Sequence, residues 1–214
     1  MFKGITFGVY GLIALVLFMA GFCAWYAIAS IPYFPRSLRS EIVNCPPAEF
    51  AYEGPIPVLD DFEQDWFAAE LRGLRERPIF NDADAPEKVV RFTWMRSFHA
   101  PVMVRTVQGP NGEVRLIARR VPGLDGCPER ARGCEVDRLL TPEERAVLAP
   151  LQARVAAGPG HECRGGLDGA RWLVEFSGGG RYKVAQSFSP DTGPIHDLGI
   201  AMLGLTGWTF TSVY

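Results

Sequence analysis

The sequence predicts an α+β domain that follows one transmembrane helix near the amino terminus. The run Gly4–Ile31 contains no charged residue and exceeds the ~20 apolar residues that a helix needs to cross a bilayer. Later segments alternate apolar and polar residues, which is typical of half-buried strands, and others repeat apolar residues at helical spacing. We therefore expect a membrane anchor and stalk over residues 1–35 and one domain over residues 36–214.

Two alternatives to an uncleaved anchor stay open. A secretory signal would be cleaved after Ala27-Ile28-Ala29, but its apolar core would be about 7–15 residues long, shorter than this run. A lipoprotein signal would modify Cys23, but the bulky Phe22 stands where such a signal needs a small residue. We favour the anchor, because Trp25 and Tyr26 are of the kind that gathers at a membrane–water interface.

The domain is predicted to begin with an irregular segment and a helix. Prolines interrupt residues 36–59, so no regular element is expected there. Residues 60–76 are predicted to be helical, because carboxylates crowd the first turn and arginines crowd the last, as the helix dipole favours. The apolar face of this helix is predicted to comprise Phe62, Trp66, Leu71 and Leu74.

A meander of antiparallel strands is predicted next. Lys88–Phe98 and Val102–Gln108 alternate in character, and Glu113–Val121 returns after Asn111-Gly112, the strongest short-range signal for a hairpin turn. A short strand near Glu135–Leu139 is expected after the loop that holds two cysteines. The alternation within each segment predicts that one face of the sheet is apolar and packs on a core.

Helix and hairpin signals follow each other in the last third of the chain. Thr141 and Glu144 can form a capping box around a proline at the first helical position, so a helix is expected to begin there. Ala170–Ser177 and Arg181–Phe188 are predicted to pair as a C-terminal hairpin. Pro194–Leu205 is apolar nearly all round, so it is predicted to be a helix buried against the sheet.

These elements predict an antiparallel sheet made of a meander plus a C-terminal hairpin, with two or three helices packed on it. Helices that are segregated to one face of such a sheet are typical of the α+β class. Two glycines of the last helix, Gly199 and Gly204, are expected to let that helix approach the sheet closely.

Beyond the predicted anchor the chain holds Cys45, Cys127, Cys134 and Cys163. An even number favours disulfides, which persist in oxidising compartments. Cys127 and Cys134 bracket a short loop and are the expected pair, which leaves Cys45 to bond with Cys163. Zinc is the alternative, but the gap is wider than zinc motifs use and no histidine stands at partner spacing, so no metal site is predicted. The disulfides favour a periplasmic domain on a bacterial inner membrane.

The sequence holds no motif that predicts a catalytic residue or a cofactor. Its histidines match neither a hydrolase elbow, a phosphate-binding loop nor a metalloprotease helix. The net charge of −2 leaves no broad basic field for nucleic acid. Weak candidates for ligand binding are His99, Arg96, Arg105 and Trp94.

One polar residue on an apolar strand face needs a partner. Arg96 shares its predicted face with Trp94, and a buried arginine without a partner is costly. Glu175 is the candidate partner, provided that the strand alternation slips by one residue. A hydrolase-type enzyme is the alternative function if His99, Arg96 and Arg105 share an open cleft with a carboxylate.

Two segments resemble blocks found together in a group of uncharacterised bacterial membrane-anchored envelope proteins. Val90–Val107 carries an aromatic strand followed by arginine, phenylalanine and His-x-Pro. Leu167–Gly207 carries Asp-Gly-x-x-Trp, a Gly-Arg-Tyr hairpin, Ser-Pro and an apolar glycine-rich helix. The resemblance implies membership of that group, and because the group has no known activity it transfers no catalytic residue.

The function expected from the sequence is that of a single-pass, membrane-anchored binding or assembly module in the periplasm. Residues 4–31 would contact the lipid bilayer, and another envelope protein is the expected partner. The acidic and proline-rich segment 46–65 and the turn around His99 are the expected contact surfaces. An accessory single-pass subunit of a membrane complex is a further alternative, in which the helix itself packs beside others.

Overall fold

The computed structural model describes residues 10–21, 32–47, 53–122, 127 and 134–214. The chain divides into two compact units, Met1–Tyr33 and Phe34–Tyr214. In the first unit residues 10–21 are helical and exposed. Among the residues that the structure describes, no helix combines the length and the apolar character that crossing a bilayer requires. The remainder of the predicted anchor, with Cys23 and the signal-cleavage alternative, lies outside the described residues.

The second unit is an α+β domain, as predicted, with antiparallel sheets of two and six strands. Its strands are β1 (Ile42–Cys45), β2 (Gly54–Pro57), β3 (Lys88–Arg96), β4 (Val102–Gln108), β5 (Val114–Arg120), β6 (Glu135–Leu139), β7 (Ala170–Gly178) and β8 (Arg181–Phe188). Its helices are η1 (Arg36–Arg39), α2 (Asp61–Gly73), η2 (Phe80–Asp82), α3 (Pro142–Ala157) and α4 (Pro194–Gly204).

The large sheet has the strand order β6-β5-β4-β3-β7-β8. Strands β3 to β6 form the predicted meander, and β7 and β8 form the predicted C-terminal hairpin. The hairpin joins the meander because β7 pairs with β3, which places Arg91 directly opposite Glu175. Segments that lie far apart in the sequence therefore meet at the centre of the sheet.

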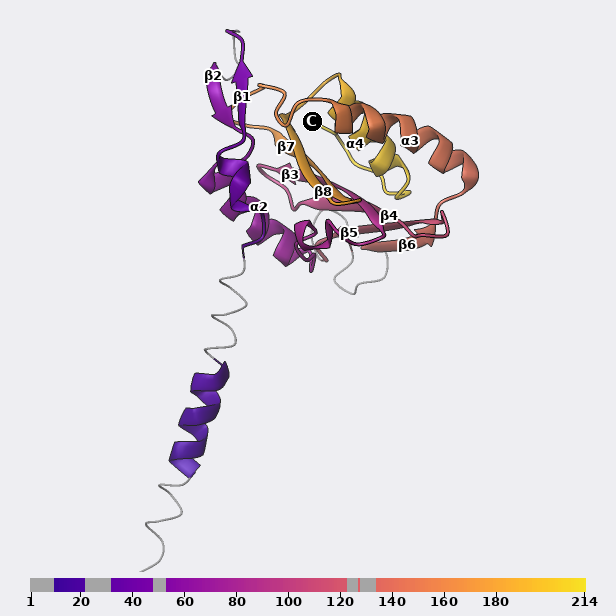
Figure 1. Ribbon diagram of the computed structural model, residues 1–214. Coiled ribbons are helices and arrows are strands. Elements are labelled where there is room, and N and C mark those ends of the chain that lie inside the picture. Colours follow the sequence, from indigo (N-terminus) through magenta and orange to yellow (C-terminus); the bar gives the residue numbers. More distant parts are fainter. Residues whose placement is uncertain (1–9, 22–31, 48–52, 123–126, 128–133) are drawn as a thin grey trace, which may run out of the picture. The chain divides into compact units, whose positions relative to one another are not determined.

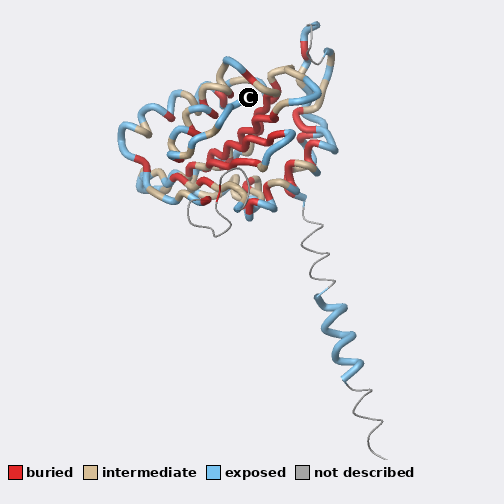
Figure 2. The backbone as a smooth tube through the Cα atoms, turned by 180° about the vertical axis from the view of Figure 1, so that it is seen from behind, coloured by how far each residue is buried: buried red, intermediate tan, exposed pale blue. Residues whose placement is uncertain are grey.

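Different helices cover the two faces of the sheet (Figure 1). Helices α3 and α4 pack on the face that carries the main apolar core, and α2 packs on the opposite face. The prediction that the helices lie on one face is therefore wrong for α2. The central strands are the most deeply buried part of the domain (Figure 2). Core residues from the strands include Phe92, Trp94, Val104, Leu116, Trp172 and Val174.

Helix α2 buries a partly polar face. Asp60 and Glu63 form a capping box at its start, and Glu63 lies 3.3 Å from Arg171 of β7. The buried side chains of the helix are Glu63, Gln64, Phe67, Ala68 and Leu71, whereas Phe62 is 73% exposed. The predicted apolar face is therefore wrong at Phe62, because the sheet beneath α2 offers polar partners that a count of apolar residues cannot reveal.

Two short strands occupy the segment that was expected to be irregular. Strands β1 and β2 pair in antiparallel register, with Ile42 opposite Pro57 and Cys45 opposite Gly54. Proline is tolerated there because each strand lies at the edge of a two-stranded sheet and can leave one side without donors. Residues 48–52, which belong to the expected contact segment 46–65, lie outside the described residues.

In the second half of the domain, helices α3 and α4 form where capping residues and apolar residues in the sequence predict them. The capping box between Thr141 and Glu144 is present at the start of α3. In α4 a side chain at Gly199 would overlap the ring of Trp172, so this glycine permits the expected close approach. Gly204 has open space around it, so its predicted packing role is wrong.

Both predicted cysteine pairs are at disulfide distance. Cys45 pairs with Cys163 and Cys127 pairs with Cys134, each with a Cα–Cα distance of 5.5 Å. The first bond joins the end of β1 to the loop before β7, and the second closes the loop between β5 and β6. The pairing of the sulfur atoms supports the disulfide interpretation of these four cysteines over the zinc alternative.

Candidate functional site

Three of the four predicted binding candidates lie near the end of β3. His99 is exposed, and its Nδ1 lies 2.9 Å from the hydroxyl of Tyr214. Arg96 donates to the carbonyl oxygen of Ala100, and its guanidinium lies 4.5 Å from the centre of the Trp94 ring. Trp94 itself is fully buried in the core. The turn is therefore held by local polar contacts and by stacking of a cation on an aromatic ring.

The last residues of the chain line a small cavity beside His99. Its volume is about 140 Å³, and residues within 209–214 form much of its wall. The indole N–H groups of Trp94 and Trp172 both donate to the backbone oxygen of Tyr214, at 2.9 and 2.8 Å. In the described part of the chain no carboxylate side chain lines this cavity. The carboxylate that the hydrolase alternative places beside His99 is therefore not among the described residues that line this cavity.

Arg105, the fourth candidate, lies on the opposite face of the sheet. Its Nε is 3.0 Å from Oε2 of Glu76, which follows helix α2. Glu175 belongs to the same face and is fully buried. The arginine and this carboxylate are thus separated from the His99 turn by the sheet, and the hydrolase alternative gains no support from their arrangement.

Glu175 pairs with Arg91, and the predicted pairing with Arg96 is wrong. Nε and Nη2 of Arg91 each donate to Glu175 at 2.7 Å, and the hydroxyl of Tyr182 donates to the same carboxylate at 2.7 Å. The alternation of β3 does not slip, so Arg91 faces α2 while Arg96 faces the other side. A bidentate pair of this kind positions two strands relative to each other.

Glu76 extends this network toward the far edge of the sheet. Its carboxylate lies 3.5 Å from Arg91, 3.0 Å from Arg105 and 2.7 Å from Arg119. Burial lowers the pKa of Arg105 from its ordinary value, while the neighbouring Glu76 opposes that shift. The cluster ties the end of α2 to three adjacent strands, and we interpret it as architecture because its charges are already paired.

A larger concave site lies on the face of the sheet that carries the apolar core, between the sheet and α3. This pocket has a volume of about 570 Å³, within the range of clefts that hold small-molecule ligands. Its floor is one row of residues across four neighbouring strands, in register with one another. The row comprises Thr106, Val90, Phe176 and Lys183.

Cations line one side of this pocket. Lys88 and Arg181 are exposed, and neither has an ion-pair partner within the described part of the chain. Between their strands lies Gly178, which is so close to the backbone of Glu87 that this position leaves no room for a side chain. Lys183 donates to the carbonyl oxygens at the end of α3, which anchors its ammonium group beside the floor. No carboxylate lines the pocket among the described residues.

This pocket was not predicted from the sequence, although the sequence holds one signal for it. The chain contains only three lysines, Lys3, Lys88 and Lys183. Two of the three line one pocket, despite lying on strands that are far apart in the sequence. The scarcity of lysine could therefore have singled these positions out, but their convergence depends on the pairing of β3 with β7.

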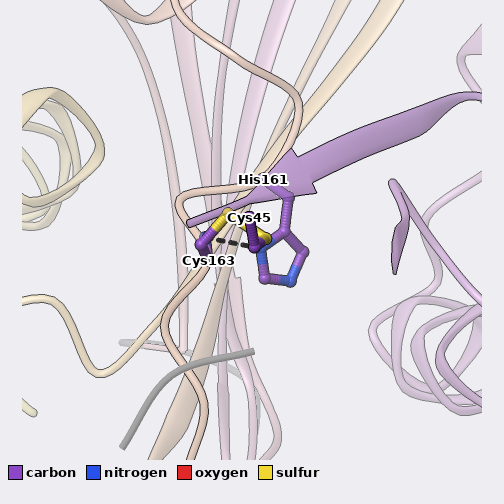
Figure 3. The surroundings of a disulfide bond; sticks show 3 residues. All are labelled: Cys45, His161 and Cys163. Carbon is purple, nitrogen blue, oxygen red and sulfur yellow. Dashed lines mark hydrogen bonds between the residues drawn. A yellow bond between two sulfur atoms is a disulfide. The ribbon is translucent and has the colours of Figure 1, made fainter. Parts of the chain in front are cut away.

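A second cluster of reactive groups surrounds the disulfide between Cys45 and Cys163. A ring nitrogen of His161 and both sulfur atoms lie within 4.8 Å of one another (Figure 3). The backbone N–H of Cys163 donates to Nδ1 of His161 at 2.7 Å. Burial, and to a lesser degree the positive Arg171, lowers the pKa of His161 to about 4. The imidazole is therefore neutral at pH 7, with Nδ1 as its unprotonated nitrogen.

Because the pKa of His161 is lowered in the folded protein, we expect the free energy of unfolding to fall in mild acid. Between pH 6.5 and pH 4 the unfolded chain protonates His161 and the folded chain does not, so unfolding takes up a proton. We expect this residue to lower the free energy of unfolding by about 3 kcal/mol as the pH falls from 7 to 4. Chemical unfolding of the chain and of His161→Asn at both pH values measures the effect.

The difference between the two proteins isolates His161 from other titrating groups. Burial raises the pKa of Glu63, although Arg171 opposes that shift, so Glu63 stabilises the fold as the pH falls. That contribution has the opposite sign and is present in both proteins. Equal losses of stability in the chain and in His161→Asn would contradict the prediction.

Comparisons with known proteins identify no relative of this chain. No protein-family model matches the chain, and no curated protein is detectably similar to it. The resemblance to a group of uncharacterised envelope proteins therefore stays a prediction.

Proposed function

We propose that this chain is a membrane-anchored binding module of the bacterial envelope, and that its pocket under α3 holds a small anionic ligand with an apolar body. The observation that carries the proposal is the meeting of Lys88, Arg181 and Lys183 around a floor that includes Val90 and Phe176. An apolar surface with a few polar groups on one side is the usual composition of a small-molecule site.

The charge of the pocket determines the class of ligand. Two of its cations have no ion-pair partner in the part of the chain that the structure describes, and an anion would supply one. The aromatic and aliphatic floor would bury the apolar part of the same ligand. Fatty acids and other single-chain amphiphiles with a carboxylate combine both features.

The setting of the module is part of the proposal. The uncharged run Gly4–Ile31 supports an anchor in the bacterial inner membrane, and the two cysteine pairs at disulfide distance support a domain in the periplasm. A domain tethered at a membrane surface works where amphiphiles are concentrated. An anchor in the membrane and a pocket for an amphiphile are therefore mutually consistent.

The test compares three probes that separate charge from apolar surface. Octanoate carries both, octanol lacks the charge and acetate lacks the chain. We expect octanoate to bind the full chain in a non-ionic detergent at least tenfold more tightly than either of the others, by isothermal titration calorimetry. In the variant Lys88→Gln/Arg181→Gln we expect octanoate to bind about tenfold more weakly or worse, because a lost charge-assisted bond costs about 1.5 kcal/mol or more.

The matched control removes a cation from the other face of the sheet. Arg115 of β5 is exposed and pairs with Asp137 of β6, so Arg115→Gln changes the net charge without touching the pocket. Octanoate affinity should be unchanged in this variant. Equal binding of octanoate and octanol, or equal losses in the pocket variant and the control, would overturn the proposed ligand class.

A protein partner is the second candidate, and it is favoured by apolar side chains near the His99 turn. Phe98 is 71% exposed and Leu167 is 98% exposed. The two segments that carry them are joined by a hydrogen bond from the backbone N–H of Ser97 to the carbonyl oxygen of Gly169. Co-purification from native membranes with the chain and with Phe98→Ser/Leu167→Ser tests this candidate, since a partner that docks here is lost from the variant.

A further inference from the structure

We propose that Cys45, Cys163 and His161 form a metal site that takes up Zn²⁺ when the disulfide between the two cysteines is reduced. The three residues come from two separate segments, the end of β1 and the loop before β7. Their potential ligand atoms lie within 4.8 Å of one another (Figure 3). Two thiolates and an imidazole are among the ligands that Zn²⁺ prefers.

The spacing of the three groups suits a tetrahedral ion after a small relaxation. Zinc bonds of about 2.3 Å to sulfur and 2.0–2.1 Å to nitrogen place ligand atoms roughly 3.5–3.8 Å apart around a tetrahedral centre. The sulfur atoms are closer than this in the disulfide, and breaking the bond lets them separate. The ring nitrogen lies within 4.8 Å of both sulfur atoms, so it would have to approach them by no more than about 1.3 Å.

His161 is prepared for such a role by its surroundings. Its side chain is buried in the fold, with only 2% of the residue exposed, and one of its ring nitrogens lies close to both sulfur atoms. In the oxidised protein the Nδ1 lone pair accepts the backbone N–H of Cys163, and a metal bound at this nitrogen would replace that hydrogen bond. Cys163 is only partly buried, so the fourth position of the metal would be open to water on that side.

The two states of the site exclude each other. A dithiol reductant would donate two electrons and two protons, so that the sulfur–sulfur bond breaks, both cysteines become thiols and the reductant becomes a disulfide. Zinc then displaces the two thiol protons and bonds both sulfurs. The oxidised site cannot offer thiolates, so the occupancy of the metal would report the redox state around the domain.

The experiment uses the full chain with Cys23, Cys127 and Cys134 replaced by serine, so that Cys45 and Cys163 are its only thiols. The protein is reduced with a phosphine, desalted without air and titrated with Co²⁺ in a non-ionic detergent. We expect one equivalent of Co²⁺ to bind, with the thiolate charge-transfer and visible bands of a tetrahedral complex, and Zn²⁺ to displace it. The oxidised protein should show none of these bands.

The role of the histidine is tested by a matched pair of variants. His161→Asn keeps an oxygen that can accept the backbone N–H but is a poor zinc ligand, and we expect it to lower the zinc affinity of the reduced protein at least tenfold. The control is His196→Asn, because His196 of α4 stacks on Trp172 of β7 and is not one of the three clustered ligands. Its zinc affinity should equal that of the parent.

Several results would overturn the proposal. These are no cobalt bands in the reduced protein, equal metal binding before and after reduction, or equal affinities in the two histidine variants. Circular dichroism in the near ultraviolet monitors the fold throughout. If the reduced protein unfolds and zinc does not restore the native spectrum, the site is purely a structural disulfide.

Discussion

Replacing Arg91 by methionine is expected to lower the free energy of unfolding by about 3–5 kcal/mol, because it leaves a buried carboxylate without its counter-charge. Arg91 and Glu175 are both fully buried, on the neighbouring central strands β3 and β7. Arg91 donates two hydrogen bonds of 2.7 Å to the Glu175 carboxylate, and among the described residues only the hydroxyl of Tyr182 would remain bonded to it. Urea unfolding followed by tryptophan fluorescence measures the loss.

The double variant Arg91→Met/Glu175→Leu separates the cost of an unpaired charge from the worth of the pair. Replacing a buried ion pair by apolar residues of similar size is often neutral, so we expect the double variant to regain most of the stability that either single variant loses. Glu76 keeps Arg105 and Arg119 in that protein, and the rest of the network is retained.

An exposed pair of the same chemistry provides the control. Arg115 and Asp137 also bridge adjacent strands, but their side chains are 58% and 49% exposed. Arg115→Met is therefore expected to cost less than about 1 kcal/mol. If Arg91→Met cost no more than this exposed control, the interpretation of the buried network as a determinant of stability would be wrong.

The contrast between local and distant interactions also explains what could be predicted from the sequence. The hairpin at Asn111-Gly112 and the capping box between Thr141 and Glu144 were predicted because each depends on residues within a few positions of one another. The disulfides were predicted by elimination among four cysteines, one pair of which lies in a single short loop.

The partner of Glu175 could not be predicted in this way. Arg91 lies 84 residues earlier in the chain, and the two meet only because β7 pairs with β3 and not with its predecessor in the sequence. Without that pairing, Arg96 was as reasonable a partner as any arginine of the strand. The same pairing brings Lys88 and Lys183 to one pocket.

The polar face of α2 was missed for a related reason. A prediction from apolar residues alone assigns Phe62 to the buried face, although Phe62 is exposed and the polar residues Glu63 and Gln64 are buried. The side-chain amide of Gln64 donates to the carbonyl oxygen of Leu59, and Glu63 meets Gln186 and Arg171 of the sheet. Burial of these polar side chains follows from partners on other elements, which helical periodicity cannot identify.

The disulfide between Cys45 and Cys163 is expected to have the largest single effect on stability. Its cysteines are 118 positions apart, so the bond closes a long loop and removes much of the freedom of the unfolded chain. The loop-entropy relation gives about 5 kcal/mol for this bond. We expect the variant Cys45→Ser/Cys163→Ser to lose stability on this scale, measured by urea unfolding of the oxidised protein.

The matched control is the other disulfide. Cys127 and Cys134 are 7 positions apart, and the same relation gives about 2.5 kcal/mol for their bond. Losing the long-loop bond should therefore cost roughly twice as much as Cys127→Ser/Cys134→Ser. Equal losses would contradict loop entropy as the source of the stability. A loss at Cys45 and Cys163 that is smaller than the loss at Cys127 and Cys134 would contradict it as well.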